Sequence, residues 1–391
     1  MPSGILQDSM GKKLFFYLAT VAFMLALMEA FAFVAVQLVD RDDFFDHREG
    51  VLQRLNAQNL AKAAQDSTDM VLGWRNFGPR SQVDYSCRGV EIEYSYDAAG
   101  ARIYQGFDPA EARVIIVGDS YTNGDEVGNE STYPAKLAEL LEVSVANHGV
   151  GGYGPAQSVL NFSESAAIYP RADVVVLGIM YENLYRMMNS YRPVLYSTSS
   201  DYTLKPYMAA GKLMPHPGPA AFSSLDNFLE IANGAFDADF WAKPRAEFPY
   251  LASLLKSLGS HYFIYRKFQK SLREIGFPEY FLIFEDPEVE LSLVSLLNEY
   301  AELAGRAGLQ PVAVFIPRNR HDISSAAKFI EKHREQFNAD LVLGDVGQHP
   351  GVDWVEFNQR EPEGDNICHP SPYGYQVIAD YIYGLLLENR F

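Results

Sequence analysis

Short apolar runs alternate with helical segments from residue 113 onward, and no other feature limits the possible folds so strongly. The apolar runs lie at 114–117, 143–146, 174–177, 311–316, 339–346 and 354–357. The helical segments lie at 133–141, 155–167, 291–307, 324–337 and 372–388. Continuous apolar strands that alternate with helices are typical of a parallel sheet covered on both faces, so residues 113–391 are predicted to form an α/β domain.

The rhythm is interrupted between about residues 185 and 285. This stretch is rich in aromatic residues and proline, without a repeat, and we interpret it as an insertion of roughly a hundred residues. In open α/β sheets ligands bind at the carboxyl ends of the strands, so an insertion over that edge would line a substrate cleft. Alternatively, its aromatic residues only pack the insertion onto the domain.

Residues 14–39 form an apolar run of 26 residues, long enough to cross the hydrocarbon layer of a bilayer as a helix. Lys12 and Lys13 precede the run, which predicts a cytoplasmic segment at 1–13 and an extracytoplasmic remainder, periplasmic or extracellular. The alternative is a cleaved signal peptide with its cleavage site at 30–32, which places the bulk of the chain on the same side.

Residues 40–112 connect this anchor to the α/β domain. The first part, 46–69, has helix-forming composition and is predicted to be an amphipathic juxtamembrane stalk. The second part, 70–110, is rich in glycine, tyrosine and arginine and is expected to be extended chain and turns.

Charge and cysteine content exclude several classes of function. The chain has 32 basic and 50 acidic residues, and a formal net charge of −18 opposes binding to nucleic acid. No cluster of histidine, cysteine and carboxylate residues has metal-ligand spacing, so neither a metal nor another cofactor is expected. The two cysteines, Cys87 and Cys368, either pair in an oxidising compartment or stay buried and unpaired.

The candidate nucleophile follows the first apolar strand, where the sequence continues as Gly118-Asp119-Ser120. A serine in the turn between a buried strand and a helix presents its hydroxyl at the carboxyl edge of the sheet. Its own backbone N–H lies near a helix N-terminus, where developing negative charge is stabilised. This position suits a nucleophile in acyl transfer.

Four blocks together resemble the SGNH (GDSL) hydrolase family, over residues 113 to about 389 without the insertion. Three of them come directly after the first three predicted strands, at 118–120, 147–157 and 178–183. The fourth lies near the C-terminus, at 365–374. The resemblance implies a three-layer α/β/α, flavodoxin-like domain with Ser120 as nucleophile and His369 as base. It further implies an oxyanion hole made by Ser120, Gly152 and Asn183.

Two blocks depart from the family pattern. Asn183 lies five residues after Gly178 and is not followed by aspartate, and Asp365 lies four residues before His369 where three is usual. Asp365 is the predicted partner of the His369 ring, with Asn366 or a simple Ser–His dyad as alternatives. Among the other histidines only His148 competes as a base by its position after the second strand.

These residues predict a serine-dependent esterase or O-acyltransferase that acts on ester (acyl) groups. By the family resemblance and the predicted topology, the expected substrate is an acylated glycan of the cell envelope or an exported polysaccharide. The alternative is a non-catalytic glycan-binding or scaffold protein that retains the fold.

Overall fold

A computed structural model describes residues 4–39, 41–197, 202–277, 280–320, 323–360 and 367–390. Five parallel strands form its central sheet in the order β4-β3-β5-β8-β9. They are β3 (Ala112–Gly118), β4 (Ser144–Gly149), β5 (Val174–Met180), β8 (Gln310–Ile316) and β9 (Val342–Asp345). This is the flavodoxin-like strand order.

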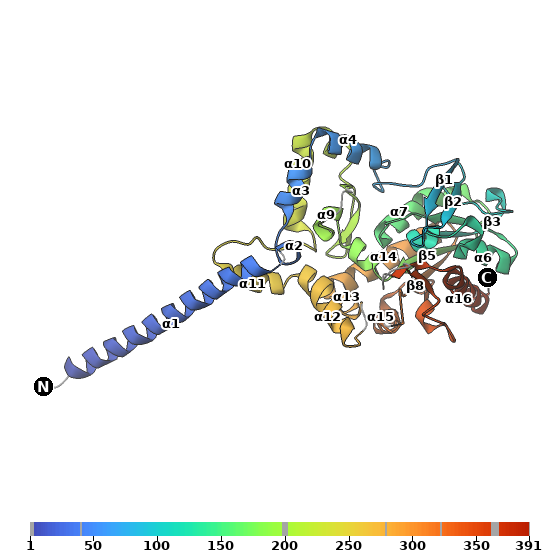
Figure 1. The fold of residues 1–391 in the computed structure, drawn as a ribbon. Coiled ribbons are helices and arrows are strands. Elements are labelled where there is room, and N and C mark those ends of the chain that lie inside the picture. The colour runs from blue at the N-terminus through green and yellow to red at the C-terminus, as the bar shows by residue number, and fades with distance from the viewer. Residues whose placement is uncertain are drawn as a thin grey trace.

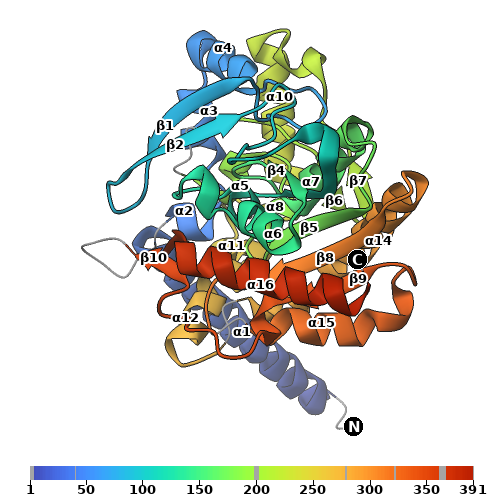
Figure 2. The same cartoon turned by 90° about the vertical axis from the view of Figure 1, so that its right-hand side faces the viewer.

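Helices cover both faces of the sheet (Figure 2). One layer holds α6 (Tyr133–Leu141) and α16 (Pro372–Glu388), and the other holds α7 (Pro155–Ser165) and α14 (Pro287–Arg306). Successive strand residues enter opposite layers: Val114 and Ile116 pack with α6 and α16, whereas Ile115 and Val117 pack with α7 and α14. The predicted three-layer α/β/α arrangement is confirmed.

The apolar run at 354–357 forms a turn instead of continuing the strand pattern. The Asp353 side chain accepts the Val355 N–H at 2.8 Å, and its carbonyl oxygen accepts the Phe357 N–H at 3.0 Å. These bonds favour a turn over extended chain, because an aspartate side chain that bonds the backbone two residues on imitates a turn. A short strand, β10 (Asn358–Arg360), follows and pairs with β11 (Ile367–Pro370).

The segment between β5 and α14 is mainly helical. Its helices and hairpin strands are α8 (Asn183–Met187), α9 (Arg192–Leu195), β6 (Tyr207–Ala209), β7 (Lys212–Met214), α10 (Leu225–Ala238), α11 (Tyr250–Leu258), α12 (Gln269–Glu274) and α13 (Phe281–Phe284). Many of its aromatic side chains are internal. Trp241 is fully buried, its indole N–H donates to the Tyr185 carbonyl at 2.9 Å, and the two rings lie 5.0 Å apart. Such aromatic residues pack the segment together.

The N-terminal helix α1 (Gly4–Leu38) projects away from the rest of the chain (Figure 1). Its segment Lys13–Leu38 has a mean hydropathy of 2.2 and is long and apolar enough to span a membrane. Three short helices follow, α2 (Arg41–Phe44), α3 (Arg48–Arg54) and α4 (Ala57–Asp66), and both α3 and α4 pack against α10. The residues that follow α1 are therefore attached to the inserted segment.

Glu29 connects α1 to the inserted segment. Its carboxylate accepts hydrogen bonds from the backbone N–H groups of Tyr250 and Leu251, the latter at 3.1 Å. The first N–H groups of a helix have no partner within the helix, so Glu29 caps α11. This contact gives the acidic residue within the apolar run a structural role.

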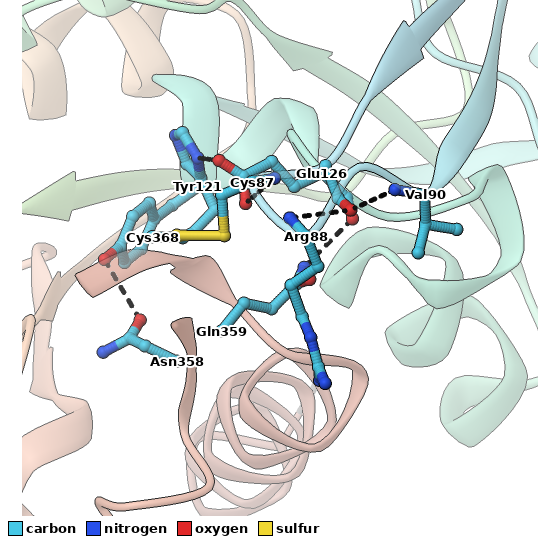
Figure 3. The surroundings of a disulfide bond; sticks show 10 residues. Cys87, Arg88, Val90, Tyr121, Glu126, Asn358, Gln359 and Cys368 are labelled. Carbon is cyan, nitrogen blue, oxygen red and sulfur yellow. Dashed lines mark hydrogen bonds and ion pairs between the residues drawn. A yellow bond between two sulfur atoms is a disulfide. The ribbon is translucent and has the colours of Figure 1, made fainter. Parts of the chain in front are cut away.

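A disulfide ties an early hairpin to the C-terminal region. The hairpin consists of β1 (Arg80–Tyr85) and β2 (Glu91–Tyr96), and Cys87 lies in the loop between these strands. Cys87 is bonded to Cys368 in β11, with their Cα atoms 6.3 Å apart (Figure 3). The two cysteines, which the sequence left as either paired or unpaired, are paired in this structure.

Replacing both Cys87 and Cys368 with serine is expected to lower the free energy of unfolding by about 2–5 kcal/mol. The bond joins two residues that are 281 positions apart in the sequence. Its loss increases the conformational entropy of the unfolded chain, which destabilises the folded state. Chemical denaturation of the full chain in detergent measures the change. Unchanged unfolding midpoints for the double variant and the oxidised parent would contradict the expectation.

Candidate active site

Ser120 lies where the strand order of the sheet reverses. From β3 the chain passes to β4 on one side, and then to β5 on the other side of β3. In open α/β sheets this switch point, at the carboxyl ends of the strands, is where ligands bind. Ser120 directly follows β3 as the first residue of the short helix α5 (Ser120–Asn123), and it is 4% exposed.

Glycines at the strand ends make room for α5. A Cβ atom on Gly118 would lie 2.0 Å from Thr122 Oγ1, and one on Gly149 would lie 2.0 Å from the Asn123 nitrogen. Thr122 Oγ1 in turn lies 2.8 Å from the Tyr133 hydroxyl. The glycines of the first two sequence blocks therefore allow the helix that carries Ser120 to sit directly on the sheet edge.

Asp119 fixes the start of α5. Its Oδ1 accepts the Tyr121 N–H at 3.0 Å, which caps the helix. Burial raises the pKa of this fully buried carboxyl group. Two contacts oppose the rise: the Arg186 guanidinium, whose Nη1 lies 3.9 Å from Oδ2, and to a lesser extent a hydrogen bond from Asn183. Asp119 thus serves the conformation of the turn that presents Ser120.

His369 comes from β11, which packs against α5. Its Nδ1 lies 2.8 Å from Glu126 Oε1, and its ring contacts the Tyr121 ring edge-on at 5.7 Å. Burial lowers the pKa of His369, but the hydrogen bond to Glu126 and the charges of Asp125 and Glu126 outweigh it, so the pKa is raised above its ordinary value. The carboxylate therefore orients the ring and stabilises its protonated form.

Glu126 is the residue of the candidate site that the sequence motifs missed. Its Oε2 accepts the Cys87 N–H at 3.3 Å, its own N–H donates to the Tyr94 hydroxyl at 2.7 Å, and its carbonyl accepts from the Gln359 side chain at 3.0 Å. Figure 3 shows Glu126 beside the disulfide. Burial would raise the pKa of Glu126, but the hydrogen bond and charge of His369 lower it, which keeps the group ionised at neutral pH.

Ser120 and His369 lie on two elements that pack against each other, α5 and β11. No hydrogen bond joins the Ser120 hydroxyl to His369 among the described residues, and the other ring nitrogen, Nε2, lies 4.0 Å from Asp125 Oδ2. Catalytic hydrogen bonds are often long before substrate binds. The structure thus packs the helix that carries Ser120 against the strand that carries His369, and Asp125 is a further carboxylate that faces the ring.

The three residues predicted to hold an oxyanion all lie at this edge of the sheet. Within the described ranges, neither the Ser120 N–H nor the Gly152 N–H donates a hydrogen bond. Gly152 has a φ of +81°, which favours glycine. Asn183 is 1% exposed and accepts the Arg186 Nη1 hydrogen at 3.0 Å through Oδ1, so its amide N–H₂, which has two hydrogens, could donate one to Asp119 and one to an oxyanion.

Asp365, the predicted partner of His369, lies outside the described residues, as does Asn366. Their roles remain predictions from the sequence. Glu126 already occupies Nδ1 of the ring, the nitrogen at which such a partner acts.

His148, the competing base, is a buried structural residue. It is 4% exposed, and its Nε2 lies 2.6 Å from the Tyr169 hydroxyl. Burial, and to a lesser extent the charge of Arg75, lowers the pKa of His148 to about 4. These contacts favour His369 over His148 as the base.

Cys87, Glu126 and Cys368 are the group of potential metal ligands that lies close together in the described part of the chain. The two sulfur atoms are bonded to each other, so neither is available as the thiolate that binds metals. The group therefore does not fit a metal site in this oxidised form.

Comparisons with known proteins give similarity to solved structures only. No family model matches the chain, and no curated protein matches its sequence. A lipolytic protein of the G-D-S-L family from Desulfitobacterium hafniense matches with 12% identity and a TM-score of 0.31, covering 70% of this chain and 99% of that one.

Two carbohydrate-active enzymes match at a similar level. An acetyl xylan esterase from Butyrivibrio proteoclasticus has 10% identity and a TM-score of 0.31, over 74% of this chain and 66% of that one. A family two carbohydrate esterase from Clostridium thermocellum, solved with cellohexaose, has 11% identity and the same TM-score, over 74% and 67%. Such values are too low to transfer a function or a residue role to this chain.

Proposed function

We propose that this protein is a serine-dependent esterase or O-acyltransferase with Ser120 as nucleophile and His369 as base. The observation that carries the proposal is the 2.8 Å contact between His369 Nδ1 and the Glu126 carboxylate, on a strand packed against the helix of Ser120. A histidine oriented by a carboxylate, on a strand packed against the helix that carries a serine at the switch point, supplies the residue types needed for nucleophilic catalysis.

The proposed reaction begins when Ser120 Oγ attacks the ester carbonyl carbon while His369 Nε2 accepts the serine proton. The Glu126 carboxylate stabilises the resulting imidazolium. The backbone N–H groups of Ser120 and Gly152, with the Asn183 amide, stabilise the negative charge on the carbonyl oxygen. The C–O bond to the alcohol then breaks, His369 returns the proton to that alcohol, and the acyl group remains on Ser120.

The acyl group then passes to a second hydroxyl compound. Attack by water gives an esterase, and attack by a sugar hydroxyl gives an O-acyltransferase. An acylated envelope or exported glycan is the proposed substrate, in keeping with the SGNH resemblance of the four sequence blocks. We further propose that α1 anchors the chain in the membrane with the α/β domain outside, since α1 continues past the possible cleavage site and packs on α11.

A fluorophosphonate probe tests the nucleophile directly. Such probes phosphonylate activated serines, so the parent chain is expected to carry one adduct on Ser120 and the Ser120→Ala variant none, as measured by mass spectrometry of the intact protein and its peptides. Ser158→Ala, which changes a buried serine of α7, is the matched control and should label like the parent. A parent chain without an adduct would instead favour the non-catalytic, glycan-binding alternative.

A further inference from the structure

Helix α11 has the reverse of the side-chain arrangement expected for a surface helix in water. The buried side chains of this helix are two serines, Ser253 and Ser257. Two of its leucines face outward instead, and Leu255 is 61% exposed and Leu258 39%. A helix in water normally buries leucine and exposes serine. The two exposed leucines lie three residues apart, so they share one face of the helix.

Hydrogen bonds hold α11 in this orientation. The Ser253 hydroxyl donates to the Glu247 carbonyl oxygen at 2.8 Å, and the Ser257 hydroxyl donates to the Phe44 carbonyl oxygen at the end of α2. Rotating the helix to bury its leucines would break both bonds and leave buried polar groups without partners. The outward position of the leucines is therefore built into the contacts of the opposite face.

The exposed apolar surface is connected to α1 through aromatic rings. Phe248, two residues before α11, is 72% exposed, and its ring centre lies 6.3 Å from that of Tyr250. The Tyr250 ring in turn packs edge-on against Phe33 of α1 at 5.1 Å. Grouped apolar side chains at a surface mark contact with a membrane or a protein. Here Phe248, Leu255 and Leu258 belong to an element packed on the apolar helix.

The contact with Glu29 sets the depth of α11 relative to the proposed membrane span. A hydrocarbon layer of about 30 Å takes about 20 helical residues. Every run of that length within Lys13–Leu38 includes Glu29, so this residue lies inside the layer wherever the span is placed. The Tyr250 and Leu251 N–H groups donate to its carboxylate, so the first turn of α11 lies at the same depth (Figure 1).

We infer that α11 lies in the bilayer leaflet on the side of the α/β domain, with Phe248, Leu255 and Leu258 against lipid acyl chains. The inference rests on the proposed membrane anchor α1 and goes beyond it, because it makes the inserted segment a second membrane contact. In lipid the arrangement of α11 is the favourable one, with apolar side chains toward the acyl chains and serines toward protein. Unpaired backbone N–H groups are costly there, and Glu29 pairs two of the first turn.

A fluorescent probe quenched by lipid tests the inference. The two native cysteines are bonded to each other, so an introduced cysteine is the single free thiol of the full-length chain. Leu255→Cys and Leu258→Cys are labelled with an NBD fluorophore and reconstituted in phosphatidylcholine vesicles, with or without brominated acyl chains. We expect bromine to quench both probes at least about threefold more than a probe at Val355→Cys. Val355 is the matched control, since it is 65% exposed but belongs to the α/β domain.

A probe at Leu25→Cys, within the apolar segment of α1, separates this inference from the proposed anchor. Quenching at Leu25→Cys, with no more quenching at Leu255→Cys and Leu258→Cys than at Val355→Cys, would overturn the inference and leave the anchor standing. Quenching at the two α11 positions without quenching at Leu25→Cys would support the lipid contact and refute the anchor. Quenching at none of the three would refute both. Apolar emission from the α11 probes that bromine does not quench would mean that protein covers them, which also overturns the inference.

Discussion

Replacing His369 with alanine is expected to lower kcat/KM for an activated acetyl ester by about 10³-fold or more, with little change in the free energy of unfolding. The side chain accepts the serine proton and then returns it to the leaving group, so its loss removes both transfers. Its ring is partly exposed and its main protein contacts are Glu126 and Tyr121, so its removal creates no large cavity. Initial rates of the purified variant measure the effect.

His148→Gln is the matched control for this experiment. His148 bonds Tyr169, and with a pKa of about 4 it is already neutral at the pH of the assay. The glutamine variant should therefore retain most of the activity. Loss of activity in this variant together with near-normal rates in His369→Ala would reverse the assignment of the base.

Glu126→Gln is expected to lower kcat/KM by roughly 10²- to 10⁴-fold, because the neutral amide neither stabilises the imidazolium nor fixes the productive tautomer. The pH dependence should also change. The base must be unprotonated to act, so kcat/KM rises with pH through the pKa of His369. The pKa of His369 lies above its ordinary value in the parent, in part because of the Glu126 charge. Removing this charge should lower the pKa, so the rise in kcat/KM should occur at lower pH.

Two further variants make the comparison decisive. Glu139→Gln removes an exposed carboxylate of α6 and should leave both kcat/KM and its pH dependence unchanged. Asp365→Asn tests the partner predicted from the sequence. If Asp365→Asn lowers kcat/KM strongly and shifts its pH dependence, and Glu126→Gln does neither, then Asp365 is the partner of the His369 ring and the role of Glu126 is contradicted.

The elements of the sheet were predictable because their signals are local. Helices α6 and α16 have the predicted bounds, and the runs at 114–117 and 174–177 lie within β3 and β5. Wholly apolar strands and capped helices carry this information in a few consecutive residues. The turn at 354–357 differs because a single aspartate side chain, that of Asp353, reorganises a short apolar run.

The partner of His369 was less accessible to sequence analysis. Glu126 belongs to no motif, and only its place in the loop after Ser120 gave a signal. It reaches His369 because the hairpin supplies the Cys87 N–H and the Tyr94 hydroxyl, and the disulfide draws β11 to the same place. Contacts between loops that are far apart in the sequence leave no periodic pattern in either loop.

The cap that Glu29 places on α11 affects where the candidate active site lies relative to a membrane. Ala32 and Val36 near the end of α1 are fully buried, and the inserted segment with α3 and α4 lies between α1 and the sheet (Figure 1). If α1 spans the bilayer as proposed, these helices form a rigid spacer between the membrane and the α/β domain, and not a flexible linker. The edge of the sheet that carries Ser120 is then held at a fixed distance from the membrane surface. Under the proposed function, this position favours as substrate a polymer that passes at that distance over a lipid headgroup in the membrane surface.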